Sequence, residues 1–285
     1  MKTNLTSSGR PLSRALYASV IAIAVLGTLP RNAHAQLYVA QESLGIVSEY
    51  DVKTGATINA NFITGLNEPA GLLVKGDDLF VANFGNGTVG KYDAKTGTAI
   101  NANFIAGLGG PQYMVLSGNT FLVTNGDSGT VGKYKAKTGI VINANFITGF
   151  MFPEGLVLAG DRLFVGDFGA GTVGEYKATT GSTTHADFIT GLSSPDGLLV
   201  LSDKLLVASF GNGTVGEYNA KTGTAINANF ITGLDGPQEL ALLGNKLFVA
   251  NAHSGTVGEY DAKTGTAINA NFITGLGFLH GLAVK

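Results

Sequence analysis

Polar side chains that could bind a cation or move a proton recur along the chain at intervals of 42 residues. One series comprises Ala70, Gln112, Glu154, Asp196, Gln238 and His280. A second series comprises Gln41, Asn83, Asn125, Asp167, Ser209 and Asn251. Carboxylate and amide oxygens suit a hard divalent cation such as Ca²⁺, and carboxyl groups held close together can serve as a general acid or base. Whether they do so depends on a fold that gathers them.

The intervals belong to an internal repeat that covers most of the chain. Its clearest markers are Tyr50, Tyr92, Tyr134, Tyr176, Tyr218 and Tyr260. Around them the sequence is almost duplicated, as GTVGEYNAKTGTAINANFITGL at residues 213–234 and GTVGEYDAKTGTAINANFITGL at residues 255–276. A period of 42 residues is typical of the four-stranded blades of a β-propeller.

Each period divides into four strand-length pieces. Within residues 69–106 the pieces GLLV, LFVAN, TVGKY and AINANFI alternate with the connectors KGDD, FGNG and DAKTG. The pieces are rich in Val, Ile, Phe and Tyr and the connectors in Gly, Asn and Asp, which is the pattern of short strands and tight turns. Gly97, which ends one DAKTG turn, is expected to adopt a left-handed conformation that penalises any side chain.

The segment GNGTVG at residues 85–90 matches the glycine pattern of a dinucleotide-binding loop. A similar GAGTVG occurs at residues 169–174, and GNGTVG returns at 211–216. The dinucleotide fingerprint requires a helix after the glycines, because the helix N-terminus holds the pyrophosphate. Here the strand-like TVGKY follows, so the motif predicts a hairpin turn and not a nucleotide site.

The two ends of the repeat array complement each other. The last copy stops after the GLAV piece at residues 281–284, and the piece that should follow is LYVAQ at residues 37–41. A C-terminal strand would therefore complete a blade whose other strands come from the N-terminal side, which closes the ring. We predict an all-β, six-bladed propeller over residues 36–285, with four antiparallel strands per blade, the GLLV-type strand innermost and both polar series at the mouth of the channel.

Residues 1–35 have the composition of a secretory signal peptide. Lys2, Arg10 and Arg14 precede a short apolar run, and Ala33-His34-Ala35 resembles a cleavage site. The run is shorter than the roughly 20 residues that span a membrane. We therefore expect a secreted or periplasmic protein without a membrane span after cleavage.

Charge restricts the partners of the mature chain. The full chain has 18 basic and 20 acidic residues. Without residues 1–35 it has 14 basic and 20 acidic residues, which gives a net charge of −6. An acidic surface argues against nucleic acid as a partner. The partner is expected to be a protein, a glycan or a small molecule, and the protein a monomer.

The pattern P-x-G-L-x-V, L-F-V-A-N and G-T-V-G-E-Y-D resembles the NHL-type repeats of secreted bacterial propellers across residues 36–285. It is more distantly similar to the gluconolactonase and senescence-marker-protein superfamily. That resemblance implies a Glu/Asn/Asp site for Ca²⁺ or another divalent cation at the channel mouth, for which the candidate residues are Asn125, Glu154, Asp167 and Asp196. The alternative is that these residues line a water-filled channel and bind no cofactor.

Two functions are compatible with this sequence. The first is a non-catalytic binding or interaction module. Its expected ligand site at the mouth comprises Asn83, Gln112, Asn125, Phe152, Glu154, Asp167, Asp196, Asn251, Phe278 and His280. The second is a metal-assisted hydrolase or lyase, of the lactonase or antibiotic-lyase kind, with Glu154 and His280 as candidate catalytic groups. No G-x-S-x-G, cysteine nucleophile or H-E-x-x-H is present.

Overall fold

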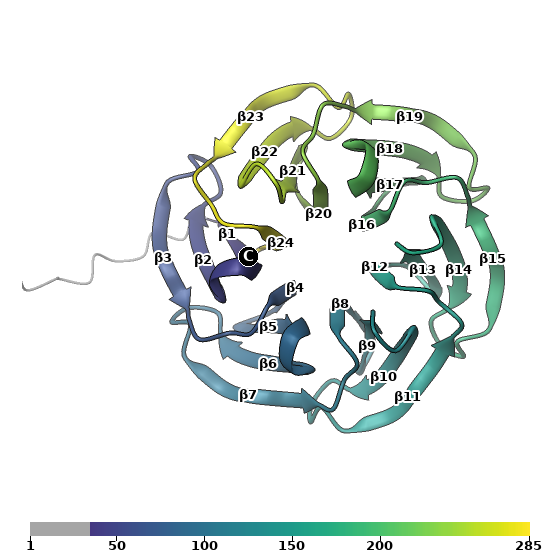
Figure 1. Cartoon of the computed structure of the whole chain (residues 1–285), viewed down its shortest axis with the longest axis horizontal. Helices are drawn as coiled ribbons and strands as arrows, with labels where there is room; N and C mark the ends of the chain where they lie inside the picture. The colour runs from purple at the N-terminus through teal and green to yellow at the C-terminus, as the bar shows by residue number, and fades with distance from the viewer. Residues whose placement is uncertain (1–34) are drawn as a thin grey trace, which may run out of the picture. The chain divides into compact units, whose positions relative to one another are not determined.

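The computed structural model describes residues 35–285 as six four-stranded antiparallel sheets arranged in a ring (Figure 1). The innermost strands are β4 (Pro69–Lys75), β8 (Pro111–Ser117), β12 (Pro153–Ala159), β16 (Pro195–Leu201), β20 (Pro237–Leu243) and β24 (Leu279–Val284). The second strands are β1 (Gln36–Gln41), β5 (Asp78–Asn83), β9 (Thr120–Asn125), β13 (Arg162–Asp167), β17 (Lys204–Ser209) and β21 (Lys246–Asn251). This arrangement confirms the predicted six-bladed propeller.

The two outer layers complete each blade. The third strands are β2 (Ile46–Asp51), β6 (Thr88–Asp93), β10 (Thr130–Lys135), β14 (Thr172–Lys177), β18 (Thr214–Asn219) and β22 (Thr256–Asp261). The outermost strands are β3 (Thr57–Ile63), β7 (Ala99–Ala106), β11 (Val141–Thr148), β15 (Thr183–Ile189), β19 (Ala225–Ile231) and β23 (Ala267–Ile273). We number the blades I to VI by their outermost strands, β3 to β23 in chain order.

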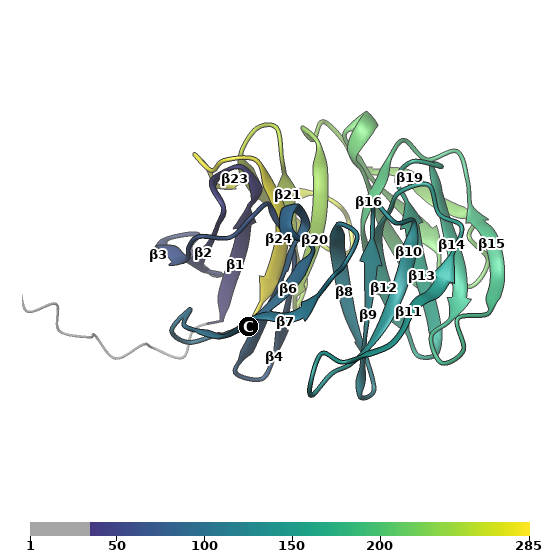
Figure 2. The same cartoon turned by 60° about the horizontal axis from the view of Figure 1, so that its bottom comes forward.

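Blade I joins the two ends of the described chain. Its strand order is β24-β1-β2-β3, as the sequence predicted, and Leu37 lies opposite Val284 in the β1–β24 pair. The backbone N–H of Gln36 donates to Lys285 O at 3.0 Å, and the N–H of Lys285 donates back to Gln36 O at 2.9 Å. The ring is therefore closed by hydrogen bonds between strands, and β24 takes its place between β20 and β4 around the axis (Figures 1 and 2).

The hydrophobic core lies between neighbouring blades. Alternate residues of each buried strand face the preceding or the following blade. Between blades II and III, for example, Phe80 and Phe121 stack edge to face with ring centroids 4.8 Å apart. Each sheet is thus covered on both sides, which explains why the second strands read as continuous apolar runs such as LFVA.

The repeated Asp-x-Lys-Thr-Gly turns lock each blade to the one before it. The Asp93 carboxylate accepts hydrogen bonds from the backbone N–H groups of Lys95 and Thr96, both at 2.8 Å. Gly97 has φ +73°, as expected from the sequence, and a Cβ added there would lie 2.0 Å from Phe62 O of blade I. Glycine is required here by conformation and by contact.

The GNGTVG segment forms a turn, which confirms the prediction against a nucleotide loop. The short 3₁₀ turn η2 (Phe84–Asn86) ends at Gly87, with φ +66°, and strand β6 begins at Thr88. Equivalent 3₁₀ turns are η1 (Glu42–Leu44) and η3 (Phe210–Asn212). Since no helix follows, no helix N-terminus is available for a pyrophosphate.

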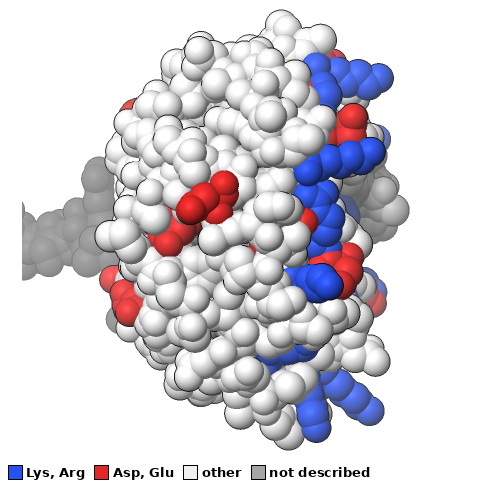
Figure 3. All heavy atoms as spheres, turned by 90° about the vertical axis from the view of Figure 1, so that its right-hand side faces the viewer, with Lys and Arg blue, Asp and Glu red and all other residues white. Residues whose placement is uncertain are grey.

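The ring has two distinct faces. The mouth face carries the connections between second and third strands, including η1, η2 and η3, together with the loops that lead into the innermost strands. The turn face, on the opposite side, carries the Asp-x-Lys-Thr-Gly turns and the hairpins between first and second strands. Figure 3 shows the basic side chains gathered along one edge of the disc, on the turn-face side.

The predicted signal peptide lies outside the described residues, apart from Ala35, and stays a prediction. The compact unit spans His34–Lys285. Within the part of the chain that the structure describes, no helix has the length and apolar character needed to cross a membrane.

Candidate functional site

A cavity of about 250 Å³ opens at the centre of the mouth face. Its wall consists of half-buried phenylalanines from several blades, and its floor consists of polar residues at the starts of innermost strands. The lining residues are Glu42, Phe84, Gln112, Phe152, Glu154, Phe168, Phe210, Gln238, Phe278 and His280. The structure therefore brings together Gln112, Phe152, Glu154, Phe278 and His280 from the predicted site.

The aromatic wall comes from two positions of the repeat. Phe84, Phe168 and Phe210 each follow a second strand, but blade III has Gly126 at that position. Phe152, which enters from the loop before β12, fills the resulting space, since a Cβ on Gly126 would lie 2.7 Å from its ring. The side chain of one blade thus compensates for a glycine in its neighbour.

The rings form a continuous chain around most of the mouth. Phe152 lies 6.3 Å from both Phe84 and Phe168, and Phe168 lies 5.8 Å from Phe210. His253 links Phe210 to Phe278, with ring centroids 4.8 and 5.9 Å away. Glu42 interrupts the wall, because it occupies in blade I the position that Phe84 occupies in blade II. The lip of the cavity is aromatic with one carboxylate.

Asp167 positions part of this wall and does not face the cavity. Its Oδ1 accepts the backbone N–H of Phe152 and its Oδ2 accepts that of Met151, both at 2.9 Å. The N–H of Ala170 reaches Oδ1 at 3.3 Å. The carboxylate is therefore fully engaged in holding the loop that carries Phe152.

The floor residues are buried where the innermost strands converge. Gln112, Glu154, Gln238 and His280 are each only 4–5% exposed. The residue after each is usually glycine because the next blade approaches closely: a Cβ on Gly155 would lie 1.8 Å from Asp196 O. Blades III and VI carry Tyr113 and Glu239 at this position, so their side chains add to the buried cluster beneath the floor.

At and beneath the floor, side chains from five blades fill the channel axis. The Tyr113 hydroxyl donates to Asp196 Oδ1 at 2.8 Å, which links β8 to β16. The rings of Tyr113 and His280 lie 5.5 Å apart. The carboxyls of Glu154, Asp196 and Glu239 are all buried in this cluster.

Burial shifts the pKa values of these three carboxyls upwards. Desolvation raises the pKa of Glu154 well above its usual range, and the neighbouring charge of Asp196 raises it further. Desolvation also raises the pKa of Glu239. The pKa of Asp196 is raised by burial, but His280 and the hydrogen bonds of Tyr113, Glu154 and Gln238 oppose that shift. Burial therefore disfavours the charged form of all three carboxyls, and for Asp196 the neighbouring groups offset part of that effect.

His280 connects the floor to the lip. Its Nδ1 lies 3.3 Å from Glu42 Oε2, and its Nε2 is buried without a hydrogen-bond partner. The other buried floor atoms in this condition are Gln112 Oε1, Glu154 Oε2 and Gln238 Oε1. Buried polar atoms are nearly always paired in native proteins, so a group of four in residues lining one cavity indicates a place for a ligand.

Three asparagines of the predicted site lie outside the cavity. Asn83, Asn125 and Asn251 each place their Nδ2 3.3 Å from a threonine hydroxyl of the next strand, those of Thr88, Thr130 and Thr256. The reason is strand alternation: Asp167 pairs with Pro153, so Glu154, one residue on, projects to the other side of the sheet. The second polar series and the floor consequently point in different directions.

The predicted cation ligands are not gathered around one point. Of Asn125, Glu154, Asp167 and Asp196, only Glu154 and Asp196 interact, while Asp167 holds backbone amides. Within residues 35–285 no group of three or more His, Cys, Asp or Glu side chains is arranged to hold a metal ion.

Several site residues were absent from the predicted set. They are Glu42, Phe84, Tyr113, Phe168, Phe210, Gln238 and Glu239. Glu42 could have been found by aligning the copies, because it replaces the phenylalanine of its neighbours. Tyr113 and Glu239 likewise stand where the other copies have glycine. The sequence did not show that their side chains reach the channel axis.

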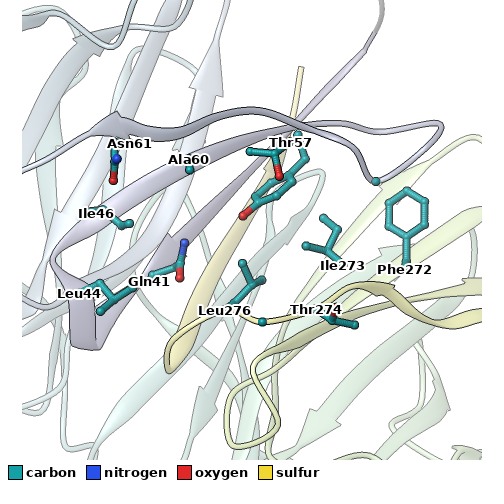
Figure 4. Close-up of a pocket in the computed structure, with 13 residues that line it drawn as sticks. Gln41, Leu44, Ile46, Thr57, Ala60, Asn61, Phe272, Ile273, Thr274 and Leu276 are labelled. Carbon is teal, nitrogen blue, oxygen red and sulfur yellow. The ribbon is translucent and has the colours of Figure 1, made fainter.

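A second cavity lies at the seam where blade I meets blade VI. It has a volume of about 520 Å³, and Figure 4 shows Gln41, Leu44 and Ile46 of blade I opposite Ile273 and Leu276. Its lining contains no acidic, basic or histidine side chain. It is larger than the mouth cavity, but only the mouth cavity is lined by acidic and histidine side chains, so the mouth is the candidate site.

Comparisons with known proteins identify the fold and no closer relationship. No protein-family model and no curated protein matches this sequence. A chain in the crystal structure of a nidogen/laminin complex superposes with a TM-score of 0.76 at 16% identity, covering 88% of this chain and 98% of that one. The computationally designed protein Ika8 gives a TM-score of 0.53 at 16% identity, covering 87% and 74%. At such identities the likeness shows the β-propeller fold alone.

Proposed function

We propose that this protein is a non-catalytic binding module whose mouth cavity holds a small ligand. The observation that carries the proposal is the group of unpartnered buried polar atoms in Gln112, Glu154, Gln238 and His280, at the floor of a phenylalanine-walled cavity. Apolar walls with a few converging polar groups are characteristic of ligand sites. Burial of these atoms without a partner costs free energy that a ligand would recover.

The size of the cavity limits the ligand to a compact molecule. Its volume of about 250 Å³ lies just below the roughly 300 Å³ at which drug-sized pockets begin. A single ring or short branched chain with a polar head would fill it. The head would contact the floor and the body would pack against Phe152, Phe168 and Phe210.

Other features support a binding role more generally. The nidogen/laminin structure shows a propeller of this architecture in a protein complex, and propellers commonly use one end of the channel for recognition. We also propose that the protein is exported, on the evidence of residues 1–35, and that its repeats are of the NHL type, on the evidence of their sequence pattern.

The test is calorimetric titration with three probes of similar shape: phenethylamine, phenethyl alcohol and phenylacetate. At least one should bind with one-to-one stoichiometry. Phe168→Ala should weaken that binding about tenfold or more because it removes part of the wall. Ile226→Ala, at an exposed position of β19, is the matched control and should leave the affinity unchanged. Failure of all three probes to bind at millimolar concentration would contradict the proposal.

A further inference from the structure

We propose that the ligand of the mouth cavity is an organic primary ammonium ion with an apolar body. This inference rests on the proposed binding function and specifies its ligand class. Three independent features of the site carry it: the sign of the charge around the mouth, the kind of hydrogen-bonding atoms left unpartnered on the floor, and the aromatic wall.

The charge around the mouth is of one sign. The acidic residues on or just beneath the mouth face are Glu42, Glu68, Asp127, Glu154, Asp167, Asp196, Asp235 and Glu239. Within residues 35–285, no Lys or Arg lies in the mouth-face loops or at the strand ends that meet them. Lys91 and Lys133, in the middle of β6 and β10, reach towards Asp78 and Thr179 O on the turn-face side. A face with carboxylates and no fixed cations attracts positive ligands and repels anions.

The unpartnered atoms of the floor are acceptors. Gln112 Oε1, Glu154 Oε2 and Gln238 Oε1 can accept hydrogen bonds. His280 turns Nδ1 towards the Glu42 carboxylate at 3.3 Å, and in the tautomer that donates this proton Nε2 is an acceptor. A primary ammonium group has three donors and no acceptor, and therefore matches the floor. A carboxylate or phosphate would instead place further acceptor oxygens against these unpartnered acceptors.

A buried carboxyl group beneath the floor strengthens the match. Asp196 is fully buried, and the Tyr113 hydroxyl donates a hydrogen bond to its Oδ1. Ionisation of a carboxyl group buried this deeply is costly, and an ammonium ion above the floor would offset that cost. Hydrogen bonds in which both partners are charged are also the strong ones.

The wall favours an organic cation over a metal ion. Phenylalanine rings supply no metal ligand, but they attract an ammonium ion by cation–π interaction within about 6 Å of the ring and pack against an apolar body. A divalent metal needs several oxygen or nitrogen ligands around one point. Among the described residues, no group of three or more His, Cys, Asp or Glu side chains is arranged to hold a metal ion.

The test on the unmodified protein adds N,N,N-trimethylphenethylammonium to the three probes above. Phenethylamine should bind about tenfold or more tightly than phenethyl alcohol, and phenylacetate should not bind measurably. The trimethyl derivative should be weaker than the primary amine, since it keeps the charge but has no donors. If the alcohol or the carboxylate binds at least as tightly as the amine, the ammonium inference fails while the binding function stands. If no probe binds, both fail.

Variants test whether Asp196 and Glu42 cause the preference for the ammonium ion. Asp196→Asn should bring the preference for phenethylamine over phenethyl alcohol close to one, while the affinity for the alcohol changes little. Glu259→Gln is the matched control, because Glu259 is equally buried but pairs with Lys246 away from the mouth. Glu42→Gln, at the half-buried lip, provides a second variant if Asp196→Asn does not fold, and it should reduce the same preference. An unchanged preference in a folded variant at either position would overturn the inference.

Discussion

The mouth face and the turn face are built from the same six repeats, yet they differ in almost every respect. On the turn face every copy of the turn ends in a glycine with positive φ, and Asp51, Asp93 and Asp261 each cap the same two backbone amides. On the mouth face the position that follows each second strand holds Glu42, Phe84, Gly126, Phe168, Phe210 and Ala252. The turn face is basic and regular, and the mouth face is acidic and irregular.

This difference separates structural from functional residues without any second sequence. All six turns keep the glycine that their left-handed backbone conformation requires, so its substitution would only cost stability. Deviations at the mouth converge on a single cavity, to which all six blades contribute. Substitutions on the turn face should therefore change stability alone, whereas those at the mouth should also change ligand binding.

The largest expected effect is on the turn face. Gly97→Ala should lower the free energy of unfolding by about 3 kcal/mol or more, because it combines an unfavourable positive φ with a collision against a backbone carbonyl. Gly76→Ala is the matched control: it has φ +60° but nothing within 4 Å, so only the conformational cost of about 1–2 kcal/mol applies. Urea unfolding measures both. Equal losses would mean that the contact with Phe62 O does not constrain the turn.

At the mouth, Asp167→Ala should cost about 2 kcal/mol, since it removes the carboxylate that accepts the amides of Met151 and Phe152. Asn125→Ala, the same position one blade earlier, should cost less than about 1 kcal/mol because its amide makes only long contacts of 3.3 Å. Unlike Gly97→Ala, Asp167→Ala should also weaken binding of the probe, by displacing Phe152. Full affinity in the folded variant would remove Asp167 from the positioning role.

The buried acids predict opposite pH dependences. The pKa of Glu239 is raised in the folded state, so the free energy of unfolding falls as the pH rises above the ordinary value of 4.5. Glu239→Gln should then stabilise the protein at neutral pH and have little effect near pH 4. The pKa of Glu175 is lowered, chiefly by Arg162, so its stabilising contribution is present above the ordinary pKa and is lost on acidification.

Glu175→Gln should therefore destabilise the protein at neutral pH and have a smaller effect at low pH. Urea unfolding of both variants between pH 4 and pH 8 distinguishes the two signs. If both substitutions changed the free energy of unfolding in the same direction, burial, and not the Arg162 partner, would govern the pKa of both carboxyls.

The smallest effect is expected at the exposed ion pairs of the turn face. Lys95 and Asp77 lie 2.8 Å apart, but both are about 60% exposed. Lys95→Met should leave the free energy of unfolding almost unchanged, because exposed ion pairs contribute little, and 1 M NaCl should abolish any remaining difference. A larger loss of stability that persists in 1 M NaCl would show that the basic side chains of this face stabilise the fold.

Most of the fold could be predicted from sequence, because each element leaves a local signal. The 42-residue period, the four strand-like pieces per copy and the left-handed glycine at Gly97 are all properties of neighbouring residues. Even the closure of the ring followed from a local fact, since the piece absent after residue 284 is present at residues 37–41. The rejection of a nucleotide site needed only the strand after GNGTVG.

The site could be predicted only in part, because it depends on how side chains are directed. Glu154 and His280 were found because they deviate from the repeat. The asparagine series was misplaced because the sequence did not reveal the hairpin register, in which the proline, and not the floor residue after it, pairs with the end of the second strand. The Tyr113–Asp196 hydrogen bond joins residues 83 positions apart, and it depends on the width of the channel, which no local pattern reveals.

The β1–β24 joint also has a mechanical consequence. Gln36 and Lys285 are hydrogen-bonded neighbours at one end of an antiparallel pair, so a force that pulls these two residues apart acts across the strands. Such a force breaks the hydrogen bonds one after another, beginning at Gln36, whereas shear along the strands would load them together. We therefore expect the ring to open one hydrogen bond after another at low tension when residues 36 and 285 are pulled apart. Heat and denaturant, in contrast, should unfold it as one unit.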